Sequence, residues 1–191
     1  APTSLLKQSV DSGEIPAVSS WVFHRSKTVH GFACGESIAA AVTSQSLFDI
    51  ASITKVMATT TSAAVLVARG ALDLDRPVRD LLEDCPLPTS VTCRGLLSHT
   101  SGLPAWRPLF QLVRSDPVTS VLYGNEPADP GIWARARRII QDAAKAPALK
   151  TGACVYSDLG FIVLGEVLER IAQASLDAIT TELVLEPFEL N

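Results

Sequence analysis

Alternation of apolar and polar residues predicts that the chain opens with an antiparallel hairpin. Residues 18–24 and 28–33 read as two strands, and the polar tripeptide Arg25-Ser26-Lys27 separates them. Two strand-like runs joined by so few polar residues are typical of a hairpin. A short amphipathic segment, residues 3–12, precedes these strands.

The pattern changes from strand-like to helical after Phe48. Residues 50–69 are apolar on nearly every helical face, and Gly70 follows where a helix C-cap glycine is expected. A helix of this kind has to be covered on all sides. Further helices are predicted at residues 132–146, 160–172 and 176–185, with proline-punctuated short helices and loops before them. Two strands followed by a mostly helical remainder predict an α+β fold.

Composition narrows the classes of function. The 191 residues are 47% hydrophobic and 19% charged, which is typical of a globular chain. A net charge of -4 without basic clusters argues against a nucleic-acid partner. No apolar run approaches the 20 residues of a membrane span. The four cysteines lie among apolar or small residues, so we expect buried thiols, with a Cys85–Cys93 disulfide as the alternative.

Ser52 and Lys55 are the first candidates for chemistry. They stand at positions i and i+3 of the predicted helix and therefore face the same side. A serine hydroxyl is a poor nucleophile at neutral pH, and an adjacent amine is one way to activate it. A serine at a helix start with a solvated lysine is the structural alternative, so this motif needs support from the rest of the chain.

Five strings in order supply that support. They closely resemble motifs of the serine β-lactamase and penicillin-binding-protein superfamily, and within it the class C-like branch, which also holds D,D-peptidases and esterases. The strings are residues 48–55, 72–78, 96–104, 156–160 and 185–188. The resemblance runs from about Asp11 to the last residue.

The resemblance implies a set of catalytic roles. Ser52 would be the acyl-accepting nucleophile, and Lys55 the amine that holds and accepts its proton. Tyr156 would relay a proton between Ser52, Lys55 and the leaving group. We expect desolvation to favour a neutral Lys55, so that the amine and the phenol can share one proton. The backbone N–H of Ser52 would be one half of an oxyanion hole.

Asp158 and Trp106 are the candidate substrate-binding residues. Asp158 stands where lactamases usually carry Asn, and a carboxylate accepts hydrogen bonds but cannot donate to a substrate carbonyl. This change weakens the case for a strict β-lactamase, and Asp158 is expected to face Lys55 as a charge partner. Trp106 lines a substrate cleft or packs beneath a proline-rich loop. His99 is expected to be a hydrogen-bonded structural histidine.

The resemblance also implies a fold. We expect one incomplete β-lactamase/transpeptidase-like domain over residues 1–191, in which the C-terminal strands of the antiparallel sheet are missing. Its parts would be residues 1–50 with the first helix and strands, the nucleophile helix at 50–70, and a helical part at 71–191. Lys150-Thr151-Gly152 spells the family's third motif but lies too close to Tyr156 to form the opposite wall of the cleft.

Two functions follow from these expectations. The first is a serine hydrolase that forms an acyl-enzyme on Ser52 and cleaves a small-molecule ester, amide or β-lactam, with no metal and no cofactor. The second is a catalytically incomplete remnant or binding subunit that needs a C-terminal segment or a complementing chain. Self-association through the exposed hairpin edge is a further expectation. Unpaired cysteines and no visible leader favour the cytoplasm, whereas a removed leader would allow the periplasm.

Overall fold

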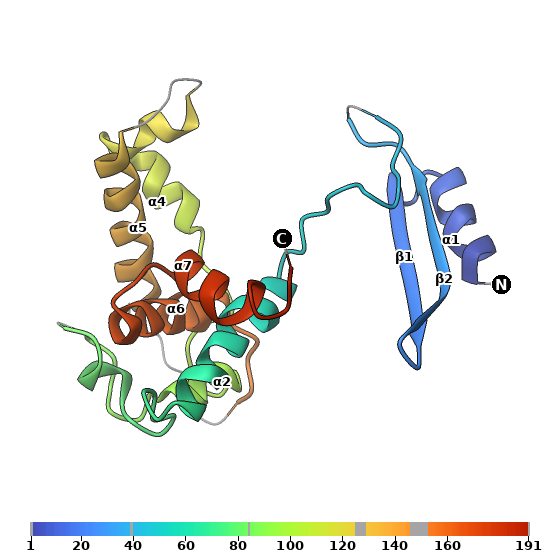
Figure 1. Cartoon of the computed structure of the whole chain (residues 1–191). Helices are drawn as coiled ribbons and strands as arrows, with labels where there is room; N and C mark the ends of the chain where they lie inside the picture. Colours follow the sequence, from blue (N-terminus) through green and yellow to red (C-terminus); the bar gives the residue numbers. More distant parts are fainter. Residues whose placement is uncertain (1, 39, 84, 125–128, 146–152, 191) are drawn as a thin grey trace. The chain divides into compact units, whose positions relative to one another are not determined.

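The chain forms two compact units, residues 1–50 and 51–191. They are seen in a computed structural model that describes residues 2–38, 40–83, 85–124, 129–145 and 153–190 (Figure 1). The Lys150-Thr151-Gly152 string lies outside the described residues.

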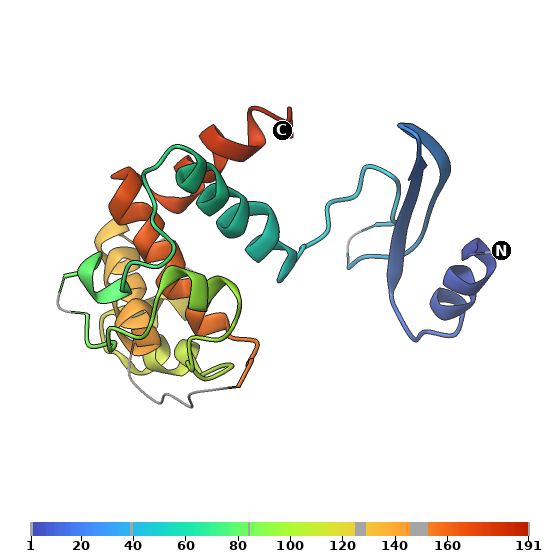
Figure 2. The same ribbon diagram turned by 90° about the horizontal axis from the view of Figure 1, so that it is seen from below.

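The first unit is the predicted hairpin with a helix beside it. Strands β1 (Ala17–His24) and β2 (Lys27–Gly35) pair antiparallel, and helix α1 (Pro2–Asp11) packs beside both strands (Figure 2). Arg25 and Ser26 form the loop with φ angles of 48° and 63°. Positive φ at both loop residues matches the right-handed twist of the flanking strands. The predicted hairpin is confirmed.

The second unit is helical. Its elements are η1 (Lys55–Thr60), α2 (Thr61–Ala68), η2 (Val78–Asp80), α3 (Cys93–Leu97), α4 (Leu109–Ser115), η3 (Thr119–Tyr123), α5 (Pro130–Lys145), α6 (Asp158–Ala172), α7 (Leu176–Thr180) and η4 (Thr181–Leu185). η1 and η4 are π-helical turns, and η2 and η3 are 3-10 turns. Helix α6 has a fully buried apolar face. It is formed by Leu159, Val163, Leu164, Val167 and Leu168.

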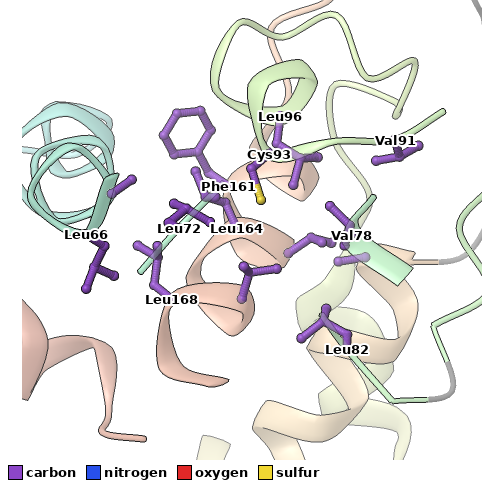
Figure 3. Close-up of a cluster of buried hydrophobic side chains, with 14 of the residues drawn as sticks. Leu66, Leu72, Val78, Leu82, Val91, Cys93, Leu96, Phe161, Leu164 and Leu168 are labelled. Atoms are coloured by element: carbon purple, nitrogen blue, oxygen red, sulfur yellow. The ribbon is translucent and has the colours of Figure 1, made fainter. Parts of the chain in front are cut away.

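Helix α6 is the centre of this unit's hydrophobic core. Leu164 and Leu168 of α6 point toward Leu72, and Leu66 of α2 lies beside them (Figure 3). Cys93 and Leu96 bring α3 against the same helix. The core therefore fixes α6 relative to α2, and with them the segments that precede these two helices in the chain.

The nucleophile helix differs from the prediction in two respects. Its helical bonding is π-helical over Lys55–Thr60 before the α-helix begins, so it is not one regular helix. Its burial is also one-sided: Ala63 and Leu66 are buried, whereas Val56 and Val67 are 62% and 37% exposed. The described residues of the second unit therefore cover one side of this helix and leave apolar side chains exposed on the other. The predicted C-cap is confirmed, because Gly70 has a φ of 72° and its N–H donates to the Val67 carbonyl.

All four cysteines are free thiols, so the Cys85–Cys93 disulfide alternative is wrong. Cys85 and Cys93 are buried as expected, and burial raises the pKa of the Cys93 thiol to about 11. Cys34 is partly buried and Cys154 is exposed, so the expectation of four buried thiols fails for these two.

Candidate active site

Ser52 and Lys55 meet as their spacing predicts. Ser52 lies in the turn that leads into η1, and the backbone N–H of Lys55 donates to the Ser52 carbonyl over 3.1 Å. This tight turn places both side chains on one side, and Lys55 Nζ donates to Ser52 Oγ over 3.0 Å. Ala51, the residue before, has a φ of 43°. A left-handed alanine costs free energy, and such positions cluster at functional sites.

Asp158 forms the expected ion pair with the amine. Lys55 Nζ lies 2.7 Å from Asp158 Oδ1, with the lysine side chain 16% and the carboxylate side chain 43% exposed. Asp158 is the first residue of α6, and its backbone N–H donates to the Ala105 carbonyl over 2.8 Å. The start of α6 therefore holds a negative charge against the nucleophile helix.

Tyr156 completes a group of four side chains. Its ring centroid lies 5.1 Å from Lys55 Nζ. A hydrogen bond with Ser52 lowers the pKa of Tyr156, partial burial opposes this, and the hydrogen bond and positive charge of Lys55 lower it further. The net pKa is below the ordinary value of a tyrosine. The phenol therefore gives up its proton more readily than a tyrosine in water.

The pKa of Lys55 moves opposite to the expectation from sequence. Burial is the largest single influence and lowers the pKa. Hydrogen bonds with Asp158 and Tyr156, together with their charges, outweigh it, so the net pKa of Lys55 is raised. The amine is held as an ammonium ion, and the phenol is the group made more acidic. The expectation that desolvation favours a neutral Lys55 is corrected accordingly.

His99 positions the segment that carries Tyr156 and Asp158. The Ser157 N–H donates to His99 Nδ1 over 3.0 Å, and the Val155 N–H donates to the His99 carbonyl over 2.9 Å. Its ring packs against Tyr156 with centroids 4.5 Å apart. Burial, followed by the charge of Lys55, lowers the pKa of His99, so the ring stays neutral and Nδ1 can accept. The expected hydrogen-bonded structural histidine is confirmed.

A large cavity opens beside these side chains. Its volume is about 840 Å³, and Ser52, Lys55 and Asp158 lie on its wall. The rest of the wall is mainly apolar and includes Phe110, Val113, Leu122, Tyr123, Trp133, Ala136, Ile140, Phe161 and Ile162. These residues come from α4, η3, α5 and α6. No local motif in the sequence marks them, because separate elements bring them together.

Trp106 does not line this cavity, although its side chain is 59% exposed. A substrate-binding role for Trp106 therefore stays a prediction. Trp133 on α5, equally exposed, is the tryptophan on the cavity wall. The only sequence signal for Trp133 was its place in the predicted helix at residues 132–146.

The chain belongs to the family whose model is described as Beta-lactamase, which matches residues 3–191. It resembles the N-acetylmuramyl-L-alanine amidase of Bacillus subtilis (strain 168), with 27% identity over 157 residues, 77% of this chain and 33% of the amidase. Its resemblance to the serine β-lactamase and penicillin-binding-protein superfamily is thereby confirmed.

Solved structures show the same fold. A class C β-lactamase from Rhodobacter sphaeroides superposes with a TM-score of 0.73 at 22% identity, covering 98% of this chain and 48% of that one. The D-amino acid amidase from Ochrobactrum anthropi SV3, complexed with D-phenylalanine, has a TM-score of 0.74 at 22% identity over 99% of this chain and 50% of that one. The chain spans a third to a half of the length of these proteins. The predicted β-lactamase/transpeptidase-like α+β fold is confirmed.

No helix in the described ranges combines the length and the hydrophobicity that crossing a membrane requires.

Proposed function

We propose that this chain carries the reacting groups of a serine hydrolase, with Ser52 as the nucleophile that becomes acylated. The observation that supports this most strongly is the 3.0 Å contact between Ser52 Oγ and Lys55 Nζ, made beside Tyr156. Nucleophilic catalysis needs a nucleophile that is oriented by a hydrogen bond and lies next to a base. Here the Lys55 amine would orient the Ser52 hydroxyl, and the Tyr156 phenolate would take its proton.

The pKa directions of Tyr156 and Lys55 support the proton-transfer roles that we propose. Tyr156, whose pKa is lowered, is the base that removes the Ser52 hydroxyl proton as Oγ attacks the substrate carbonyl carbon. Lys55, whose pKa is raised, stays charged and stabilises the phenolate. When the bond to the leaving group breaks, Tyr156 returns the proton to that group, and the acyl group stays on Ser52. Water then attacks the acyl carbon while Tyr156 takes a proton from it. When the bond between the acyl carbon and Ser52 Oγ breaks, Tyr156 returns this proton to Oγ and the carboxylic acid product leaves.

The developing oxyanion needs hydrogen-bond donors. The backbone N–H of Ser52, which precedes the helical turn η1, is our candidate for one of them. Asp158 cannot supply another, because a carboxylate only accepts hydrogen bonds and this one is already paired with Lys55.

The substrate class is a small-molecule ester or amide. Two of the similar proteins are amidases and one is a β-lactamase, all of which cleave amide bonds. We propose the same class of bond for the protein to which this chain belongs. Trp106 is kept as a candidate substrate contact outside the cavity.

The test is the burst of p-nitrophenolate released from p-nitrophenyl acetate, which reports acylation even where deacylation is slow. We expect a burst from the chain, loss of the burst in Ser52→Ala, and a decrease of about 100- to 10,000-fold in its rate constant in Tyr156→Phe. Ser12→Ala, which changes an exposed serine of the first unit, is the control. A folded chain without a burst, or a burst that survives in Ser52→Ala, contradicts the proposal.

A further inference from the structure

We infer that the cavity beside Ser52 receives the acyl group of the substrate, and that this acyl group is large, apolar and uncharged. The inference rests on the proposed function, because it assigns a substrate to the same nucleophile. The proposed function leaves open which part of the substrate enters the cavity and whether that part is apolar or charged.

Size is the first argument. Small-molecule sites usually have volumes of about 300–1,000 Å³, and most of a ligand's surface is buried in them. The cavity's 840 Å³ lies near the upper end of this range. An acetyl group would leave most of it filled with water against apolar walls, whereas an aryl or medium-chain aliphatic group would replace that water with apolar contacts.

The lining is the second argument. The side chains of Phe110, Tyr123, Trp133, Ile140 and Phe161 offer aromatic and branched aliphatic surface. Phe110, Tyr123 and Trp133 are 49%, 50% and 59% exposed. An apolar ligand in the cavity would remove the exposed surface of these aromatic rings from water, which is energetically favourable.

The charged residues of the wall are already paired, which argues against a charged acyl group. Arg137 forms an ion pair with Glu169, and Glu166 Oε1 accepts from Lys145 Nζ over 2.9 Å. The other oxygen of Glu166, Oε2, is buried and makes no hydrogen bond within the described residues, so the pairing of this carboxylate is through Oε1 alone and Oε2 presents no exposed charge. A charged acyl group would lose its hydration in the cavity without gaining a free counter-charge.

The position of Tyr156 distinguishes the acyl group from the leaving group. Tyr156 is the proposed proton donor to the leaving group, so that group must lie on the phenol's side of Ser52. Tyr156 is 54% exposed and does not line the cavity, whereas Ser52 does. The leaving group therefore departs toward the exposed phenol, and the group attached to the acyl carbon occupies the cavity.

The experiment compares p-nitrophenyl esters that share one leaving group and differ only in the acyl group: acetate, phenylacetate and octanoate. For each ester, the burst rate constant is divided by the rate constant of hydrolysis of the same ester by hydroxide. This ratio corrects for the different chemical reactivities of the three esters. We expect a corrected preference of about 100-fold for phenylacetate or octanoate over acetate.

Two neighbouring isoleucines of α5 give a matched pair of variants. Both are partly buried, but Ile140 lines the cavity and Ile139 does not. Ile140→Ala should lower the octanoate rate constant about tenfold and leave acetate within about twofold, and Ile139→Ala should change neither. Ala136→Phe, which fills the cavity, should lower the octanoate rate constant further, provided that its thermal unfolding matches the parent.

The outcomes separate the inference from the proposed function. Equal corrected rate constants for acetate and octanoate, or equal effects of Ile139→Ala and Ile140→Ala, overturn the inference while a Ser52-dependent burst keeps the proposed function. The absence of a burst with every ester from folded protein overturns both. Since the comparison of esters needs only the parent chain, a variant that fails to fold does not prevent the test.

Discussion

The carboxylate of Asp158 controls the charges of the two groups around Ser52. Its hydrogen bond and charge raise the pKa of Lys55, and its charge also raises the pKa of Tyr156, against the stronger lowering by Ser52 and Lys55. With the phenolate as the base, acylation should become faster as pH rises through the pKa of Tyr156. It should become slower again when Lys55 loses its proton at higher pH.

Asp158→Asn should therefore shift the whole pH profile of acylation toward lower pH. Removing the negative charge lowers the pKa of Tyr156, which moves the rising limb, and lowers the pKa of Lys55, which moves the falling limb. The measurement is the burst rate constant of a p-nitrophenyl ester as a function of pH. Asp80→Asn, which changes a carboxylate of the η2 turn outside the site, should leave the profile in place. A profile that stays fixed or moves to higher pH in Asp158→Asn contradicts this assignment.

Residue types and spacing predicted part of the site but not its protonation. A carboxylate in the place of an amide was sufficient to predict the ion pair of Asp158 with Lys55. The raised pKa of Lys55 depends on the distances to Asp158 and Tyr156, which the sequence does not contain. The cavity wall was not predicted either, because Phe110, Tyr123 and Trp133 lie on separate elements that only the tertiary fold brings together.

At the scale of elements, the N-terminus of α6 determines where Tyr156 and Asp158 lie. Ser157, between them, is 1% exposed. Its Oγ accepts from the Gly160 N–H over 3.0 Å, as an N-cap does, and donates to the Pro104 carbonyl over 2.7 Å. One hydroxyl therefore caps the helix and ties it to the preceding loop.

Ser157→Ala should lower the free energy of unfolding by about 2 kcal/mol, since it leaves the buried N–H of Gly160 and the partly buried carbonyl of Pro104 without this hydrogen-bond partner. It should also slow acylation, because the flanking residues lose their anchor. Urea denaturation measures the first effect. Ser175→Ala is the control: Ser175 is the N-cap residue of α7 but makes no side-chain cap bond, and its hydrogen bond with Asp177 is at an exposed position, so the loss should be well under 1 kcal/mol. Equal losses in the two variants would count against the role given to Ser157.

The sequence predicted elements where local signals agree and failed where tertiary contacts decide. The hairpin, the C-cap at Gly70 and the amphipathic α6 each carry a local pattern, and all three are present. The π-helical turn over Lys55–Thr60 has no such pattern. An i to i−5 contact in this stretch, the Thr61 Oγ1 donation to the Val56 carbonyl over 2.8 Å, accompanies it. π-Helical turns frequently occur at functional sites, and this one begins at Lys55.

At the scale of the whole molecule, the chain consists of a hairpin unit and a helical unit, and the site lies within the helical one. All of Ser52, Lys55, Tyr156 and Asp158 come from residues 51–191, as does the entire cavity wall. The order of five motifs predicted this fold better than hydrophobic patterning alone, because patterning gives the elements but not their arrangement.

The most direct test of the central claim is covalent labelling of the folded chain with a fluorophosphonate, followed by intact-mass measurement and peptide mapping. Attack by Ser52 Oγ displaces fluoride and leaves one phosphonyl group on the serine. We predict a single adduct that maps to Ser52, disappears in Ser52→Ala and forms more slowly in Tyr156→Phe. Folded protein that gains no adduct, or an adduct that persists in Ser52→Ala, would contradict the account.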